Sequence, residues 1–144
     1  MANLPYITAA GGITRAIENI KTAATPDKVS GDFVKGGLKV KGGSGDQVNS
    51  YLKKIGLADS TGTPTDLYNR VRNPSTSGAA IAQCLKIGYK PLFDRHEYAH
   101  TLNDDDLKGR IVSETGQAHD SNPVKMTFAS FKALRAFADF EDVL

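Results

Sequence analysis

Two histidines separated by one helical turn come closest to a catalytic motif in this sequence. His96 and His100 enclose Glu97 in the spacing that zinc peptidases use. In those enzymes both imidazoles lie on one helix face and bind the metal, and the Glu acts as general base toward the metal-bound water. A third ligand follows later in the chain, and here Glu114 or His119 would have to supply it. The motif makes a zinc hydrolase the enzymatic alternative.

The residues around this motif favour a different interpretation. A metal-binding helix is apolar on both sides of its histidines, whereas Asp94-Arg95 precede this motif and Asn103-Asp104 end it. Little strand pattern lies upstream to form the sheet that would cover such a helix. We therefore expect His96 and His100 to lie in a solvated loop or at a helix end, as weak metal candidates. We expect the protein to be non-enzymatic and to need no cofactor.

A glycine-rich segment, Lys41-Gly42-Gly43-Ser44-Gly45, is the second group of residues that points to chemistry. Backbone N–H groups at a helix start can hold a phosphate. The segment lacks the Gly-Lys-Ser/Thr ending of a nucleotide-binding loop. We therefore interpret it as turn glycines, with a contact to a nucleic-acid phosphate as the functional alternative.

The charge of the chain is unevenly distributed. The 144 residues carry 18 Lys and Arg against 16 Asp and Glu, which gives a formal charge of +2. Residues 1–73 hold ten basic and six acidic residues, a net +4, and residues 74–144 hold eight and ten, a net −2. The basic half is the better candidate for contact with nucleic acid.

Cysteine content and hydropathy indicate a compartment. The single Cys84 cannot form an internal disulfide, which favours a reducing environment. The first residues contain neither a basic start nor a long apolar run, and no segment approaches about 20 apolar residues. We expect a cytoplasmic protein with no membrane contact.

Periodicity and capping residues predict a mostly helical chain. Apolar residues at spacings of three and four predict a first helix over 13–24. Further helices are predicted from their start and stop signals: Thr25-Pro26-Asp27 to Gly36-Gly37, a Ser44/Gln47 capping box to Gly56, Thr65-Asp66 to Val71, Ser77 to Gly88 with Pro91 breaking or restarting the helix before Leu92, Asn103 to Gly116, and a last helix that starts at Thr127. Asp104, Asp105 and Asp106 are interpreted as acids at a helix start rather than a cation site.

The first half of the chain has the order of a helix-turn-helix followed by a wing. The helix that begins near Ser44 would be the recognition helix, with Val48, Leu52 and Ile55 turned inward, and the polar turn over 58–65 is long enough for a short hairpin or wing. Lysines and arginines would contact phosphates, while Gln47 and Asn49 would face adenine edges. The residues predicted to bind DNA are Lys39, Lys41, Ser44, Gln47, Asn49, Lys53, Lys54, Arg70 and Arg72.

Short blocks along nearly the whole chain resemble a bacterial and archaeal family catalogued as a domain of unknown function. These blocks are Leu4-Pro5-Tyr6, Ala24-Thr25-Pro26, Leu52-Lys53-Lys54-Ile55-Gly56-Leu57, Gly62-Thr63-Pro64-Thr65, Tyr89 with Leu92-Phe93, Thr115-Gly116, Thr127-Phe128, Phe131-Lys132-Ala133-Leu134 and Ala138-Asp139-Phe140. The resemblance implies a small, mostly helical, winged-helix-like fold. It implies no established activity.

The sequence as a whole predicts one compact domain over 1–144, mostly α, helix-turn-helix or winged-helix-like, with two related lobes over 1–73 and 78–144 as a possibility. The leading functional hypothesis is binding of duplex DNA. The alternative is a protein-binding or self-associating module. Its apolar contact patch would consist of Tyr89, Leu92, Phe93, Phe137 and Phe140.

Overall fold

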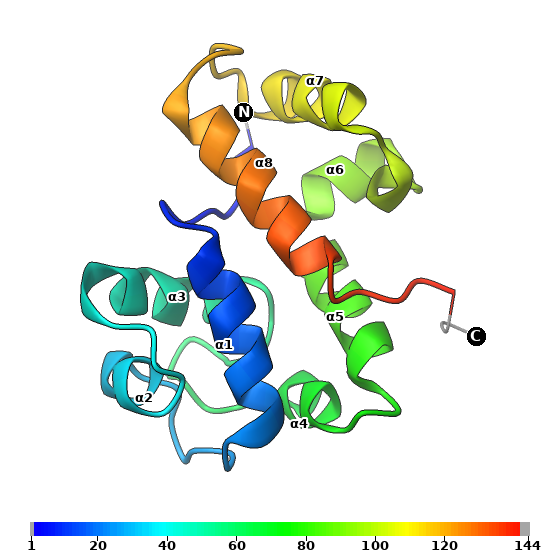
Figure 1. Ribbon diagram of the computed structural model, residues 1–144. Coiled ribbons are helices and arrows are strands. Elements are labelled where there is room, and N and C mark those ends of the chain that lie inside the picture. The colour runs from blue at the N-terminus through cyan, green and yellow to red at the C-terminus, as the bar shows by residue number, and fades with distance from the viewer. Residues whose placement is uncertain (1, 142–144) are drawn as a thin grey trace.

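The computed structural model describes residues 2–141, which form eight α-helices, one short 3₁₀ turn and no strand (Figure 1). The helices are α1 (Gly11–Thr22), α2 (Gly31–Gly36), α3 (Gly42–Lys54), α4 (Asp66–Arg72), α5 (Ser77–Gly88), α6 (Lys90–Arg95), α7 (Asp104–Thr115) and α8 (Asn122–Arg135), and the 3₁₀ turn η1 covers Ala99–Thr101. The mostly helical prediction is confirmed. None of the helices in the described part of the chain is long and apolar enough to cross a membrane.

α1 and α8 contact each other in the middle of the molecule (Figure 1). α3 and α4 pack against α1, while α5 and α7 pack against α8. A single apolar cluster runs through all of these helices, with Ile17, Leu52, Ile81, Ile111 and Leu134 among its buried members. The core is therefore continuous across the turn at residues 73–76 that separates the two predicted lobes.

Residues 2–8 join the helices that lie far apart in the sequence. The hydroxyl of Tyr89, between α5 and α6, donates to the carbonyl of Pro5 at 2.8 Å. The hydroxyl of Tyr51 lies 2.8 Å from the hydroxyl of Tyr89. Because the Tyr89 proton goes to Pro5, Tyr51 must donate to Tyr89. Burial raises the pKa of both phenols, which keeps the pair neutral. The N–H of Ile7 donates to Ser130 Oγ of α8.

α1 covers Gly11–Thr22 instead of 13–24, and α2 and α8 start five or more residues from the predicted positions. α2 begins at Gly31 and not at Thr25, because Ser30 Oγ accepts the N–H of Phe33 at 3.1 Å, and the N–H of Val29 is drawn to the carbonyl of Gly62. α8 begins at Asn122 and not at Thr127. Its N-cap is Ser121, which places Thr127 on the buried face inside the helix.

The start of α3 also differs from the prediction. The Ser44/Gln47 capping box does not form: α3 begins at Gly42, and its N-cap residue Lys41 makes no side-chain capping bond within the described residues. The amide of Gln47 instead accepts from the N–H and the hydroxyl of Thr8, at 2.7 and 3.1 Å. Gln47 therefore bonds to Thr8, which is distant in sequence, and not to the predicted local partner Ser44.

Predicted helix ends are more accurate than predicted starts. Gly56 and Gly116 are in the left-handed region that ends a helix, with φ of 88° and 71°. Gly37, with φ of −82°, is outside the left-handed region. Lys39, two residues later, is in that region with φ of 60°. The expected wing over 58–65 is a turn around Asp59 with one antiparallel bridge, Ala58 to Pro64.

The start of α3 generates a stability prediction. We expect Lys41→Ser to raise the free energy of unfolding by about 1 kcal/mol, because a hydroxyl at this position can accept an N–H of the first turn. Urea unfolding measures the change. Lys41→Ala is the matched control, since it removes the same charge and adds no cap. A Ser variant no more stable than the Ala variant would contradict the prediction.

The buried hydroxyl pair generates a second stability prediction. Tyr89→Phe removes the donor to Pro5 and the acceptor for Tyr51, so two buried groups lose their partner, and we expect a loss of about 2 kcal/mol. Tyr51→Phe keeps the bond to Pro5 and should cost about 1 kcal/mol. Urea unfolding of both variants tests the asymmetry, and equal losses or the reverse order would refute the proton assignment.

Candidate nucleic-acid interface

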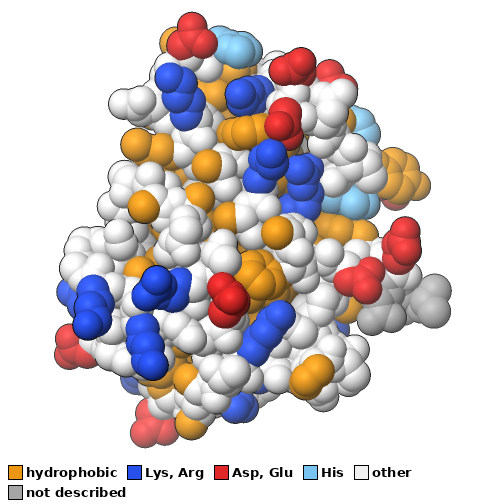
Figure 2. Space-filling view, viewed as in Figure 1, with side chains coloured by type: hydrophobic (Ala, Val, Ile, Leu, Met, Phe, Trp, Pro, Cys, Tyr) orange, Lys and Arg blue, Asp and Glu red, His pale blue; other side chains and the backbone are white. Residues whose placement is uncertain are grey.

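Four basic side chains line one open hollow of about 890 Å³, which we call the basic hollow. They are Arg15 of α1, Lys35 of α2, and Lys39 and Lys41 of the segment between α2 and α3. No Asp or Glu of the described chain is among its lining residues. Figure 2 shows Lys and Arg side chains gathered over the α1–α3 part of the molecule. The hollow is therefore a site of positive potential.

Alternating burial positions the two lysines of the connecting segment. Leu38 and Val40 are buried in the core, so Lys39 and Lys41 between and beyond them point to solvent. The segment lies close to α3 because residue 45 is a glycine: a Cβ there would clash with the carbonyl of Val40. The absence of a side chain at Gly45 therefore allows the segment that carries Lys39 and Lys41 to lie against the first turn of α3.

The backbone of Lys39 is strained. Its φ of 60° makes it the one non-glycine residue of residues 2–141 in the left-handed region. Such a conformation costs an L-residue about 1 kcal/mol and favours Gly, Asn or Asp. Lysine at this position therefore gives a less stable local backbone than Gly, Asn or Asp would give.

Two helix starts contribute to the same hollow. The first turns of α1 and α3 line it through Gly11, Gly12 and Ser44. Neither helix has a side-chain cap among the described residues. Their N–H groups and helix dipoles add to the field of the four cations.

One of the four cations has a counter-ion. Lys35 Nζ lies 3.0 Å from Asp46 Oδ1, and both side chains are partly exposed. An ion pair of this kind contributes at most about 1 kcal/mol. A polyanion that entered the hollow would compete with Asp46 for Lys35.

The structure does not bring all nine predicted DNA-binding residues together. Lys39, Lys41 and Ser44 line the basic hollow, joined by Arg15 and Lys35, which the sequence analysis missed. Arg70 Nη1 donates to Gln83, and Arg72 Nε donates to the carbonyl of Ala23, so both are used inside the fold. Lys53 and Lys54 lie at the other end of α3.

The expected base-reading face of α3 is not available. Gln47 is bonded to Thr8, and the Oδ1 of Asn49 is buried without a partner in residues 2–141. The reason is that α1 and α2 pack against α3, so this part of the helix is covered. The prediction that both amides point outward is corrected.

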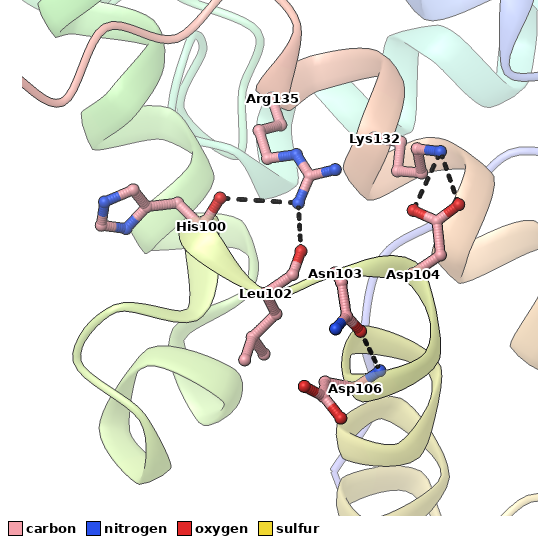
Figure 3. A network of polar contacts seen from close by, with 7 residues as sticks. All are labelled: His100, Leu102, Asn103, Asp104, Asp106, Lys132 and Arg135. Atoms are coloured by element: carbon pink, nitrogen blue, oxygen red, sulfur yellow. Dashed lines mark hydrogen bonds and ion pairs between the residues drawn. The ribbon is translucent and has the colours of Figure 1, made fainter.

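The histidine motif does not lie on one helix. α6 ends at Arg95, His96 has extended backbone, and His100 is in the 3₁₀ turn η1. Arg135 Nη1 donates to the carbonyls of His100 and Leu102, which holds this turn against α8 (Figure 3). The proposed third ligands are also engaged elsewhere: Glu114 pairs with Arg95, and His119 with Asp120. Among residues 2–141 no group of three or more His, Cys, Asp or Glu side chains is placed to hold a metal ion.

His100 packs as an aromatic residue. Its ring stacks on Phe140 with centroids 3.7 Å apart and an interplanar angle of 6°. Its Nδ1 is buried and has no partner in the described part of the chain. Burial, followed by the nearby charges of Lys86 and Arg135, holds the pKa of His100 below its ordinary value of 6.5.

The predicted apolar contact patch is largely interior. Tyr89 and Leu92 are fully buried, and Phe93, Phe137 and Phe140 are partly buried against the core. Cys84 is buried as expected, and burial raises the pKa of its thiol to about 12. Among residues 2–141 the exposed large apolar side chains are instead Tyr6, Ile87 and Tyr98.

The environment of His100 generates a prediction on acid stability. The unfolded chain takes up a proton near pH 6.5, whereas the folded chain does so only at lower pH. The free energy of unfolding must therefore fall as the pH drops through 6.5. We expect His100→Phe to lose this part of the pH dependence, while His119→Gln, at an exposed position, keeps it. Urea unfolding across this pH range measures both, and an unchanged profile in His100→Phe would contradict the assignment.

Comparison with known proteins places the chain in a family. No curated protein and no solved structure matches the chain. The model of a family of unknown function, DUF5343, matches residues 5–143, nearly the whole sequence. The chain therefore belongs to the DUF5343 family.

Proposed function

We propose that this protein binds duplex DNA through its phosphate backbone, with the basic hollow as the contact surface. The observation that carries the proposal is the convergence of Arg15, Lys35, Lys39 and Lys41 from three segments on one hollow with no lining acid. Phosphate neutralisation by such cations supplies most of the affinity of sequence-independent DNA binding. The strain at Lys39 supports a functional role, since strained residues are concentrated at functional sites.

The chemistry of the hollow favours phosphates over bases. Its polar side chains are cations and the hydroxyl of Ser44, and no aromatic ring or amide side chain lines it. Cations and hydroxyls contact phosphates, whereas amides and aromatic rings read or stack on bases. We therefore expect binding that is steeply salt-dependent and independent of DNA sequence. If all four cations contact phosphates, log K falls against log salt with a slope of about −3.6.

Removal of two cations tests the proposal. The variant Lys39→Asn plus Lys41→Gln suits the local backbone, because Asn tolerates positive φ. We expect weaker binding to a random-sequence duplex and a salt slope reduced in magnitude by about 1.8. Fluorescence anisotropy over a salt series measures both.

The control removes the same charge from the far end of α3. Lys53→Asn plus Lys54→Gln should leave the affinity and the salt slope close to wild type, because these lysines lie outside the hollow. Equal losses in the two double variants, or no binding by the wild type at low salt, would overturn the proposal.

A further inference from the structure

A second hollow, of about 610 Å³, lies along residues 2–8, and we call it the N-terminal trough. Its walls are residues 2–8, the second half of α3, the end of α7 and α8, so it is separate from the basic hollow. The hydrogen bonds from Thr8 to Gln47 fasten this segment to α3 at one end of the trough. A volume of this size fits the range of ligand pockets.

One unpaired cation faces neutral polar groups in the trough. Lys54 lines it and makes no ion pair with any described residue. No acid is among the described lining residues, which include the amide side chains of Asn3 and Gln117. The trough is thus complementary to an isolated negative charge rather than to a run of charges.

A threonine hydroxyl also lines the trough without a partner in the described chain. Thr127 is 2% exposed, and its hydroxyl makes no hydrogen bond within residues 2–141. Among the described residues, the fully buried side-chain atoms without a partner belong to Asn49, Tyr68, Ser77 and His100, so the hydroxyl of Thr127 is open to the trough. Thr127 therefore marks a position where a bound group can accept or donate a hydrogen bond.

The main chain of residues 2–8 also has hydrogen-bonding groups that are unused within the described chain. The inner groups are satisfied, because the carbonyl of Pro5 accepts from Tyr89 and the N–H of Ile7 donates to Ser130. The N–H and carbonyl groups of Leu4 and Tyr6 make no hydrogen bond within the described chain, and both residues line the trough. Alternate residues with free main-chain groups are the pattern to which an extended peptide adds as a strand.

We propose that the N-terminal trough binds an acidic peptide segment in extended conformation. The main chain of the peptide pairs with Leu4 and Tyr6, and one of its carboxylates pairs with Lys54. A polar group of the peptide completes the hydrogen bonding of Thr127. The described residues that line the trough include one cation and no acid, and Asp46 borders Lys54 only in a neighbouring hollow. This lining selects one carboxylate with flanking uncharged residues, which distinguishes the trough from the proposed DNA-binding surface.

Selection from a random peptide display library against the full chain tests this inference. We expect the enriched peptides to share an acidic residue, and we expect the best of them to lose affinity at least about tenfold on Lys54→Glu. Thr127→Val, which is isosteric and leaves no buried group unpaired, should weaken binding about threefold. Methylation of alternate peptide amides should abolish binding, because it removes the main-chain donors that a strand uses. Fluorescence anisotropy with the labelled peptide measures each change.

Lys53→Glu is the matched control, because it reverses a charge one residue away and lies outside the trough. Its affinity for the peptide should stay near wild type. The Lys39→Asn plus Lys41→Gln variant should also keep peptide binding, so failure of the DNA proposal leaves this test intact. Enrichment of peptides without an acid, no enrichment at all, or equal losses for Lys53→Glu and Lys54→Glu would overturn the inference.

Discussion

The buried chain of hydrogen bonds from Tyr51 through Tyr89 to the carbonyl of Pro5 is the constraint on which the arrangement of the molecule depends. It fastens the first residues of the chain to α3 and to the α5–α6 junction, and the edge-to-face contact of Tyr89 with Phe131 extends it to α8. In a low-dielectric interior each of these bonds is strong, and each unpaired member would be costly. Residues 2–8 are consequently bonded to the rest of the molecule at Ala2, Pro5, Ile7 and Thr8, while the main-chain groups of Leu4 and Tyr6 make no hydrogen bond within the described chain.

The surface around α3 carries two sites with different electrostatics, and residues 2–8 line only one of them. At the start of α3, four cations meet the N–H groups of two helices and suit a polyanion. At its end, Lys54 is the one cation among the described lining residues of the N-terminal trough, which include no acid, and it suits a single carboxylate. The bonds between Thr8 and Gln47 lie at one end of the N-terminal trough. The two sites share no lining residue.

Helix ends could be predicted from the sequence because their causes are local. Gly56 and Gly116 act within a few residues of themselves and have the predicted role. The start of α7 was predicted for the same reason, because its cap Asn103 bonds the nearby N–H of Asp106. Helix starts failed where a polar side chain found a distant partner, as Gln47 did with Thr8. The same limit applies to the candidate site. Lys39, Lys41 and Ser44 are close in sequence and were predicted, whereas Arg15 joins them only because α1 packs against α3.

Lys39 and Lys41 show why this limit matters for function. The left-handed backbone at residue 39 favours Gly or Asn, and the N-cap position at residue 41 favours Ser, Thr, Asp or Asn. Lysine is the locally less stable choice at both, and at residue 41 it also places a positive charge at the positive end of a helix dipole. Departures from local preference that coincide at one surface are the mark of a functional site. The repulsion among these cations and the uncapped N–H groups of α3 is relieved by a bound anion, so the same features that reduce stability favour binding.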